Sequence, residues 1–214
     1  TWKTMAAYLN GVTQTHVMCV FLGMYMEQEF LSLSLEHQQT MKWVILFHDI
    51  EKAPLPDKRD HLHAFRSAVT AARTLPRLGF QVTPEYNSHI AEWDQFTHSA
   101  VTRLKGSPDD IQDNDKLTTI LNGIELMFGK DSPAALIIQT VLFHLSVNME
   151  MWPPPKPLTN DEMKRYFNKE LASLLLVMLL ADNDGWTLFN PEVREPQRDD
   201  IIDKFQKIKQ LLST

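Results

Sequence analysis

Residues 43–52 read Trp-Val-Ile-Leu-Phe-His-Asp-Ile-Glu-Lys, an apolar stretch that ends in the pair His48-Asp49. Pro54 and Pro56 follow shortly afterwards. Proline cannot continue a helix, because its nitrogen carries no hydrogen and its ring clashes with the preceding turn. The stretch therefore predicts a buried helix whose last turn presents two side chains of the kinds that bind metal ions.

Four further side chains of the same kinds lie where helical apolar stretches would bury them. They are His16, His63, His144 and Asp182. Burying an imidazole or a carboxylate without a partner is unfavourable, and a metal centre shared by all six groups would remove that penalty. Imidazole and carboxylate together suit Mn, Fe, Co, Ni or Zn. The sequence has neither the Cys-rich spacing of structural zinc nor a His-Glu-x-x-His pair.

The rest of the chain favours helix over sheet. Its 214 residues include only 7 glycines, and Leu, Met, Ala, Lys and Glu are frequent. No segment alternates polar and apolar residues convincingly. Periodicity and helix breakers predict helices over about 5–31, 38–50, 60–78, 86–104, 113–128, 133–149, 159–182 and 198–212. We expect one all-α domain over residues 1–214.

Composition excludes several classes of protein. A net charge of -6 argues against binding to a nucleic-acid backbone, which usually needs a basic face. The single cysteine, Cys19, cannot form an internal disulfide, and its apolar neighbours favour a packing role over a catalytic one. No stretch is long and apolar enough to span a bilayer, and the start lacks a signal pattern. These features predict a cytoplasmic protein without membrane contact.

Five short pieces of sequence carry a family resemblance, and they follow one another in a fixed order. They are residues 15–17 (Thr-His-Val), 46–52 (Leu-Phe-His-Asp-Ile-Glu-Lys), 63–68 (His-Ala-Phe-Arg-Ser-Ala), 141–144 (Val-Leu-Phe-His) and 179–182 (Leu-Leu-Ala-Asp). In this order they resemble the HD-domain superfamily of metal-dependent phosphohydrolases, whose signature is usually Leu-Leu-His-Asp-Ile-Gly-Lys. The spacing is most similar to the HD modules of nucleotide-processing hydrolases and of bacterial tRNA nucleotidyltransferases.

The resemblance implies a helical HD-type bundle and a cofactor of one or two divalent transition-metal ions: Mn, Fe, Co, Ni or Zn. The ligands of the first ion would be His16, His48, Asp49 and Asp182. A second site would share Asp49 and add His63 and His144. The implied reaction is hydrolysis of a small phosphorylated molecule, a nucleotide above all, by attack of a metal-activated water on phosphorus.

Charged residues beside the ligands supply the remaining candidates for catalysis and substrate binding. Lys52, one turn from His48-Asp49, and Arg66, one turn beyond His63, are expected to bind phosphoryl oxygens. Glu51 stands where the family usually has glycine. It could act as a general base, orient a ligand or simply face solvent, and the last alternative is favoured.

Residues 80–131 lie in the long interval between His63 and His144, and we interpret them as a helical elaboration, either a cap over the site or a homodimer surface. Within it, Trp93, Phe96 and His98 are candidate cap residues, with core packing favoured. The proline-rich loop 152–157 is a candidate rim of the site. His61 competes with His63 as a ligand, and His37, His89 and His98 are expected at the surface.

Two other functions stay open at this point. Related folds that hold two irons catalyse oxygenation, so a di-iron oxygenase is one alternative. A non-catalytic module that senses a nucleotide or binds a partner through an intact fold is the other. The identity of the bound metal would separate the hydrolase from the oxygenase, and a ligand set that holds no metal would favour the sensor.

Overall fold

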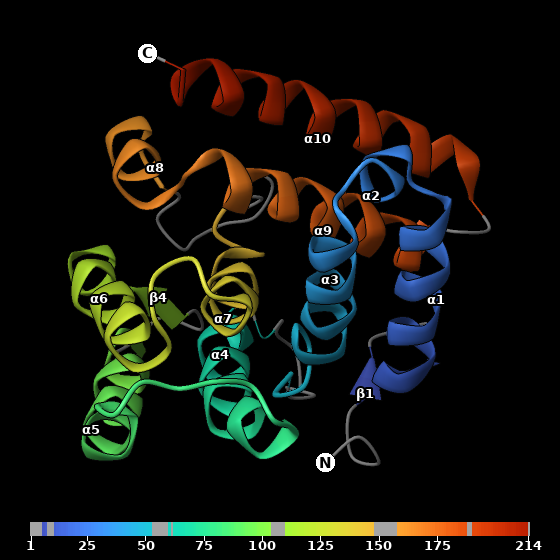
Figure 1. Ribbon diagram of the computed structural model, residues 1–214. Coiled ribbons are helices and arrows are strands. Elements are labelled where there is room, and N and C mark those ends of the chain that lie inside the picture. The colour runs from blue at the N-terminus through green and yellow to red at the C-terminus, as the bar shows by residue number, and fades with distance from the viewer. Residues whose placement is uncertain are drawn as a thin grey trace.

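The computed structural model describes residues 6–7, 11–52, 60, 62–103, 110–147, 158–187 and 190–213. Within these ranges the chain is built from helices, and this confirms the all-α class (Figure 1). The helices are α1 (Thr13–Met26), α2 (Gln28–Leu31), α3 (Leu35–Phe47), α4 (His63–Thr74), α5 (Tyr86–Ser99), α6 (Leu117–Phe128), α7 (Pro133–Phe143), α8 (Asn160–Tyr166), α9 (Lys169–Thr187) and α10 (Pro191–Leu211).

Two short antiparallel hairpins and two single-turn 3-10 helices complete the described part. The hairpins pair β1 (Ala6–Ala7) with β2 (Gly11–Val12), and β3 (Val101–Arg103) with β4 (Asp110–Gln112). The 3-10 helices are η1 (Leu75–Leu78) and η2 (Asn114–Lys116). A single helical bundle fits the observed arrangement.

Local signals in the sequence account for several helix starts. Ser132 accepts a hydrogen bond from the backbone N–H of Ala135 at the start of α7, as its position before Pro133 predicts. Thr159 and Glu162 form a capping box at the start of α8, each side chain accepting from the other residue's backbone N–H.

Other boundaries differ from the sequence prediction. The helix expected over about 5–31 is divided, because Glu27 is extended, with φ -78° and ψ 127°, and separates α1 from α2. The buried Glu27 carboxylate pairs with Arg198 of α10, a contact that local sequence does not show. The helix expected over 159–182 is likewise divided, and the Asn168 side chain accepts from the Leu171 N–H at the start of α9.

Helix α7 ends earlier than expected. The sequence predicts a helix over 133–149, but the observed helix ends at Phe143, with His144 in the turn that follows. The last helix is longer than expected. Helix α10 begins at Pro191, ahead of the expected start at 198, and contains Pro196.

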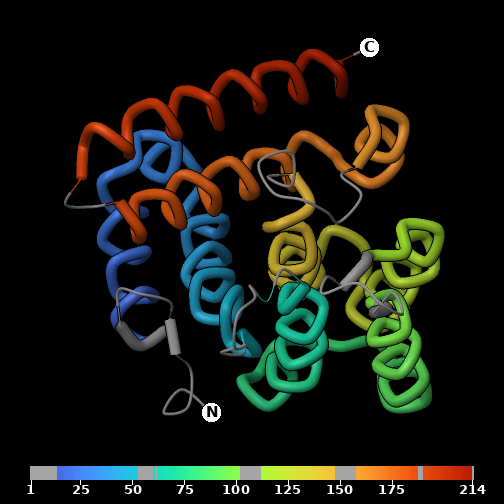
Figure 2. Tube along the Cα trace, turned by 180° about the vertical axis from the view of Figure 1, so that it is seen from behind, coloured from blue at the N-terminus to red at the C-terminus, as the bar shows by residue number. Residues whose placement is uncertain are grey.

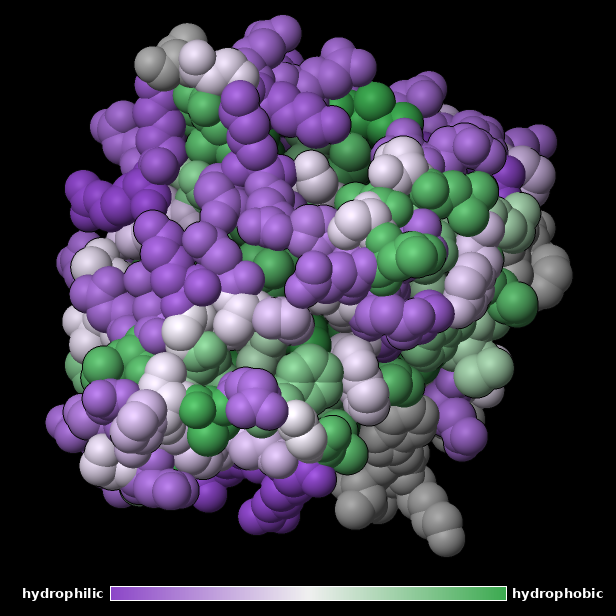
Figure 3. Space-filling view, viewed as in Figure 1, coloured by the Kyte–Doolittle hydropathy of each residue, from purple (hydrophilic) through white to green (hydrophobic). Residues whose placement is uncertain are grey.

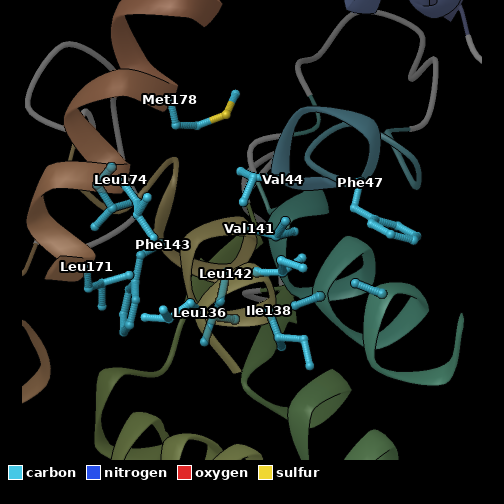
Figure 4. Close-up of a cluster of buried hydrophobic side chains, with 14 of the residues drawn as sticks. Val44, Phe47, Leu136, Ile138, Val141, Leu142, Phe143, Leu171, Leu174 and Met178 are labelled. Atoms are coloured by element: carbon cyan, nitrogen blue, oxygen red, sulfur yellow. The ribbon is translucent and has the colours of Figure 1, made fainter. Parts of the chain in front are cut away.

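Helix α7 lies at the centre of the bundle and packs against α3, α4, α6 and α9. Figure 4 shows apolar side chains of α3 and α9 meeting those of α7. The labelled residues are Val44, Phe47, Leu136, Ile138, Val141, Leu142, Phe143, Leu171, Leu174 and Met178. All of them are buried, so the central helix is apolar on nearly every side, as burial on all faces requires.

Helices α9 and α10 run side by side in opposite directions across one end of the molecule (Figures 1 and 2). Helix α1 packs along α9, so segments far apart in sequence are neighbours at this end. The described residues of the segment 80–131 form α5, β3, β4, η2 and α6, on the side of α4 and α7 away from α1 (Figure 1). Trp93 there is buried and donates from Nε1 to the Ile120 carbonyl at 2.9 Å, which favours its core-packing role.

Gly185 allows α9 to approach α1 closely, because a β-carbon there would lie 2.4 Å from Cγ2 of Val20. We expect Gly185→Ala to reduce the free energy of unfolding by about 1–3 kcal/mol, since overpacking outweighs the gain in helix propensity. Urea unfolding followed by circular dichroism measures this. Ser173→Ala on the same helix is the control, and equal stability of the two variants would contradict the prediction.

Candidate metal centre

The six candidate ligands meet in one buried cluster, although five helices contribute them. His16 lies on α1 and Asp182 on α9. His48 and Asp49 follow α3, while His63 begins α4. His144 follows the last residue of α7. The side chains of His48, Asp49, His63 and His144 are 0–2% exposed, so water does not solvate them.

Asp49 is the centre of the cluster. Its Oδ1 lies 2.7 Å from His63 Nε2 and 4.0 Å from His144 Nε2. Its Oδ2 lies 3.6 Å from the Nε2 atoms of both His16 and His48. One carboxylate thus faces two pairs of imidazoles, one pair on each oxygen.

Asp182 adds a second carboxylate on the side of His16 and His48. Its Oδ1 lies 2.9 Å from His16 Nε2 and 3.7 Å from His48 Nε2. The groups His16–His48–Asp49 and Asp49–His63–His144 each place three possible ligand atoms within 4.8 Å of one another. Donor atoms at this spacing could hold a metal ion in either group.

Three of the histidines are held in the same way by the backbone. The Nδ1 atoms of His48, His63 and His144 lie 2.6–2.7 Å from carbonyl oxygens three residues earlier in the chain. A carbonyl only accepts, so Nδ1 carries the proton and the lone pair of Nε2 points into the cluster. The Nε2 atoms of His48 and His144 have no hydrogen-bond partner in the described part of the chain, and that of His63 faces Asp49 Oδ1 at 2.7 Å.

This pattern fits a metal ion. A buried nitrogen without a hydrogen bond is unfavourable unless another group binds its lone pair. Metal-binding histidines commonly donate their other ring N–H to a backbone carbonyl, which fixes the tautomer and the orientation of the ring. The carbonyls of Ile45, Asp60 and Val141 provide that support here.

The protonation states of the cluster also suit a cation. Burial lowers the pKa of His48 and lowers that of His144 to about 3. Burial would raise the pKa of Asp49, but Lys52 and His48 together hold it well below its usual range. Burial likewise opposes the ionised form of Asp182, yet the hydrogen bond from His16 keeps its pKa below the ordinary value. Neutral imidazoles beside ionised carboxylates are the forms that bind metals.

Lys52 lies at the cluster, as its place after the ligand pair predicts. Its Nζ is 2.6 Å from Asp49 Oδ2, and its side chain is 10% exposed. Glu51 points elsewhere: its side chain is exposed and its Oε1 accepts from the Thr70 hydroxyl at 2.8 Å. This contact favours the solvent-facing alternative for Glu51.

Arg66 ties together the two segments that carry ligands. Its guanidinium donates to the Glu51 carbonyl after α3 at 3.3 Å and pairs with the Asp60 carboxylate just before α4. These contacts hold the chain near His48-Asp49 to the start of α4. The phosphate-binding role of Arg66 stays a prediction, and its described contacts are those of a cross-link.

The other histidines in the described part of the chain lie outside the cluster. His37 pairs with Glu170 at 2.5 Å, and His98 pairs with Asp94 at 2.7 Å. His89 is half-buried, and its Nδ1 lies 2.9 Å from the Glu85 carbonyl oxygen. His61 and the loop 152–157 lie outside the described residues.

Trp186 is a member of the site that the sequence analysis did not assign. Its ring stacks on His16 with 4.1 Å between centroids and 27° between planes. The Lys52 ammonium lies 5.2 Å from the centre of the same ring. The available signal is position, because Trp186 follows Asp182 by one helical turn and so lies on the same face of α9.

Trp186 helps to orient His16, whose Nδ1 lacks the backbone hydrogen bond that the other three imidazoles have. The Nδ1 of His16 has no hydrogen-bond partner among the described residues. The stacked indole and the Nε2 hydrogen bond to Asp182 therefore orient this ring together.

We expect Trp186→Leu to weaken metal binding about tenfold, as loss of ligand support commonly does. Trp186→Phe keeps an aromatic face and should retain most of the affinity. Competition with a metal-sensitive dye measures the dissociation constant for Mn²⁺ or Co²⁺ directly. If the leucine and phenylalanine variants bound metal equally well, stacking would not orient His16.

Comparison of the chain with protein-family models, with curated proteins and with solved structures gives no match. No helix in the described ranges is long and apolar enough to cross a membrane. The assignment of a function therefore depends on the geometry and chemistry of the ligand set itself.

Proposed function

We propose that this protein is a metal-dependent phosphohydrolase of the HD-domain type, acting on a small phosphorylated molecule, a nucleotide above all. The main support for the proposal is the environment of Asp49. This buried carboxylate has imidazoles facing both of its oxygens and a lysine ammonium beside it. The ordered ligand motifs of the sequence supply the family resemblance that this geometry supports.

Under this proposal the residues around Asp49 divide between two ions. The ligands of one ion are His16, His48, Asp49 and Asp182, and a second ion would share Asp49 and use His63 and His144. A divalent transition metal bound there supplies Lewis acidity towards phosphoryl oxygen and activates water for attack on phosphorus. The donor set of imidazoles and carboxylates suits Mn, Fe, Co, Ni or Zn.

The chain's own groups have separate tasks in this reaction. The carbonyls behind His48, His63 and His144 keep these rings oriented while substrate binds. The Lys52 ammonium lies beside Asp49 and would face the phosphoryl oxygens, where it offsets the charge of the transition state. The indole of Trp186 next to Lys52 limits the solvent around that ammonium, which strengthens its interaction with an anion.

A phosphatase screen on metal-loaded protein tests the proposal. We expect release of phosphate or of a nucleotide product from at least one class of nucleotide, and its loss on chelation. Lys52→Gln should reduce kcat/KM by about 100-fold, as removal of one transition-state contact does. Lys169→Gln, an exposed lysine on α9, is the control.

The outcomes distinguish the alternatives. Metal-loaded, folded protein that turns over no phosphorylated compound would overturn the hydrolase proposal. Two tightly bound irons with oxygen consumption would favour an oxygenase instead. A folded protein that binds nucleotide without metal or turnover would favour a sensing module.

A further inference from the structure

Exposed apolar side chains are concentrated on one side of the molecule. Of the ten large hydrophobic residues most exposed in the described part of the chain, six lie between positions 18 and 35. These are Met18, Leu22, Tyr25, Met26, Leu31 and Leu35. Figure 3 shows hydrophobic residues gathered on the right, where Figure 1 places α1 and α2. Grouping of this kind, unlike scattered exposed leucines, marks an interaction surface.

Helix α1 provides the regular part of this surface. Met18, Leu22 and Met26 are spaced four residues apart, so they form one continuous row along the helix, and Tyr25 lies beside it. We call these four residues the α1 ridge; their exposed fractions are 57, 55, 61 and 50% in that order. The opposite face of the helix holds buried residues such as His16 and Val20.

Helix α1 also lacks charge. Residues 13–26 contain no Asp, Glu, Lys or Arg. The outer face of a helix that remains in water normally carries charged residues, because they are the side chains that water solvates best. An apolar and uncharged outer face is typical of a helix that packs against protein on both sides.

We propose that the α1 ridge packs against the α1 ridge of a second copy of this chain and forms a two-fold symmetric dimer. A row of residues at four-residue spacing is the ridge that interdigitates with an identical row, at a crossing angle of about -50°. The two methionines add flexible side chains that adapt to such a contact. A two-fold interface requires a surface that is complementary to itself, and this row meets that requirement.

Charge and area both favour a second copy as the partner. Each chain has a net charge of -6, so two copies repel except where a neutral face is available, and α1 provides one. The α1 ridge together with the exposed Leu31 and Leu35 offers about 600 Å² per copy, or about 1,200 Å² in total, at the lower limit for a specific interface. A membrane-binding helix would instead carry Lys and Arg around its apolar face. We expect a dissociation constant on the order of 1 μM.

The proposed dimer does not depend on the metal site. His16 lies on the buried face of α1, so pairing through the outer face leaves the ligand cluster enclosed. Asp49→Ala should therefore dimerise as the wild type does. Failure of the dimer and failure of the proposed hydrolase activity are separate results.

Sedimentation equilibrium over a concentration series tests the proposal on the full chain. Wild-type protein should reach twice the 24.7 kDa of one chain at about 100 μM, far above the expected dissociation constant. The double variant Leu22→Glu/Met26→Glu should have a dissociation constant about 1,000-fold higher or more, so that most of it stays at 24.7 kDa at the same concentration. The matched control is Leu78→Glu/Leu126→Glu, whose side chains are 49 and 42% exposed outside the ridge.

A second measurement tests the dimer even if the glutamate double variant does not fold. In a Cys19→Ser background, Leu22→Cys should form a disulfide-linked dimer under mild oxidation, while Leu78→Cys should not. A wild-type protein that stays monomeric at about 100 μM would overturn the proposal, whether or not it binds lipid vesicles. Equal dimerisation of the ridge and control variants would overturn it too.

Discussion

Replacing Asp49 by alanine is expected to reduce metal bound to the purified protein from at least one equivalent per chain to a small fraction of one. Asp49 contributes to both possible ligand groups, so its loss removes a donor from each. Loss of ligand support alone weakens binding by about 10–100-fold, and loss of a shared ligand should exceed that range. Elemental analysis of protein purified without chelators or a His-tag measures the metal directly.

The controls separate loss of metal from loss of fold. Asp203→Ala removes an exposed carboxylate on α10 and should leave the metal content unchanged. Asp49→Asn keeps the shape of the side chain, removes its charge, and should lose metal with less disturbance of packing. If folded Asp49→Ala kept the metal of the wild type, Asp49 would not be a ligand. If folded wild type bound none after addition of Mn or Fe, the metal centre itself would be wrong.

Acidification gives an independent measure of the same site. Protons compete with metal for the ligand nitrogens, so the metal is released once these imidazoles protonate. Burial lowers the pKa of both His48 and His144, which stay neutral at pH values where an exposed histidine is protonated. Metal retained well below about pH 6.5, the ordinary pKa of histidine, is therefore the expected result for these two ligands.

Replacing Arg198 by methionine is expected to reduce the free energy of unfolding by about 3 kcal/mol at neutral pH. Arg198 of α10 pairs with Glu27 between α1 and α2, and its Nη1 lies 3.4 Å from Asp184 Oδ2 on α9. The Glu27 and Asp184 side chains are only 2 and 4% exposed. Without the guanidinium, two buried carboxylates would lose the cation that both contact.

The size of this effect should depend on pH in a definite direction. Burial raises the pKa of Glu27, although Arg198 opposes that shift. A carboxyl group whose pKa is raised in the folded state binds its proton more tightly there than in the unfolded chain. The destabilisation is therefore greatest above the folded-state pKa, where Glu27 is ionised, and becomes smaller as the pH falls and Glu27 is protonated.

Urea unfolding at pH 8 and at pH 5 measures both the loss and its pH dependence. Arg194→Met is the matched control, because the Arg194 guanidinium pairs with Glu195, whose side chain is 54% exposed, and such surface pairs contribute about 0–1 kcal/mol. An equal effect of the two substitutions would show that Glu27 and Asp184 do not depend on Arg198. A loss that grew on acidification would contradict the assignment to Glu27.

The cluster of candidate ligands was predictable, because most of its members end or lie within an apolar helical stretch. His48-Asp49, His144 and Asp182 are recognisable as groups that burial would leave without water, and the structure brings all three segments together. Helix starts at Ser132-Pro133 and Thr159 were predictable for a similar reason, since a cap depends on residues within one turn.

The features that the sequence analysis missed depend on distant partners. Nothing near Glu27 indicates a helix break, because the group that holds its carboxylate lies on α10. Trp186 could be placed on the face of Asp182, but its stacking on His16 depends on the packing of α9 against α1. Periodicity describes which face of a helix is apolar, and it does not say which helix covers that face.

The amino-acid sequence by itself determined the helical class, the local caps and the six candidate ligands, because short-range spacing and burial of polar groups are encoded locally. Only the tertiary structure decided that Asp49 lies between two pairs of imidazoles, that Trp186 stacks on His16, and that Met18, Leu22 and Met26 on the outer face of α1 are exposed. The physical reason is that these relations join helices distant in sequence, and only the packing of their apolar faces fixes which side chains meet.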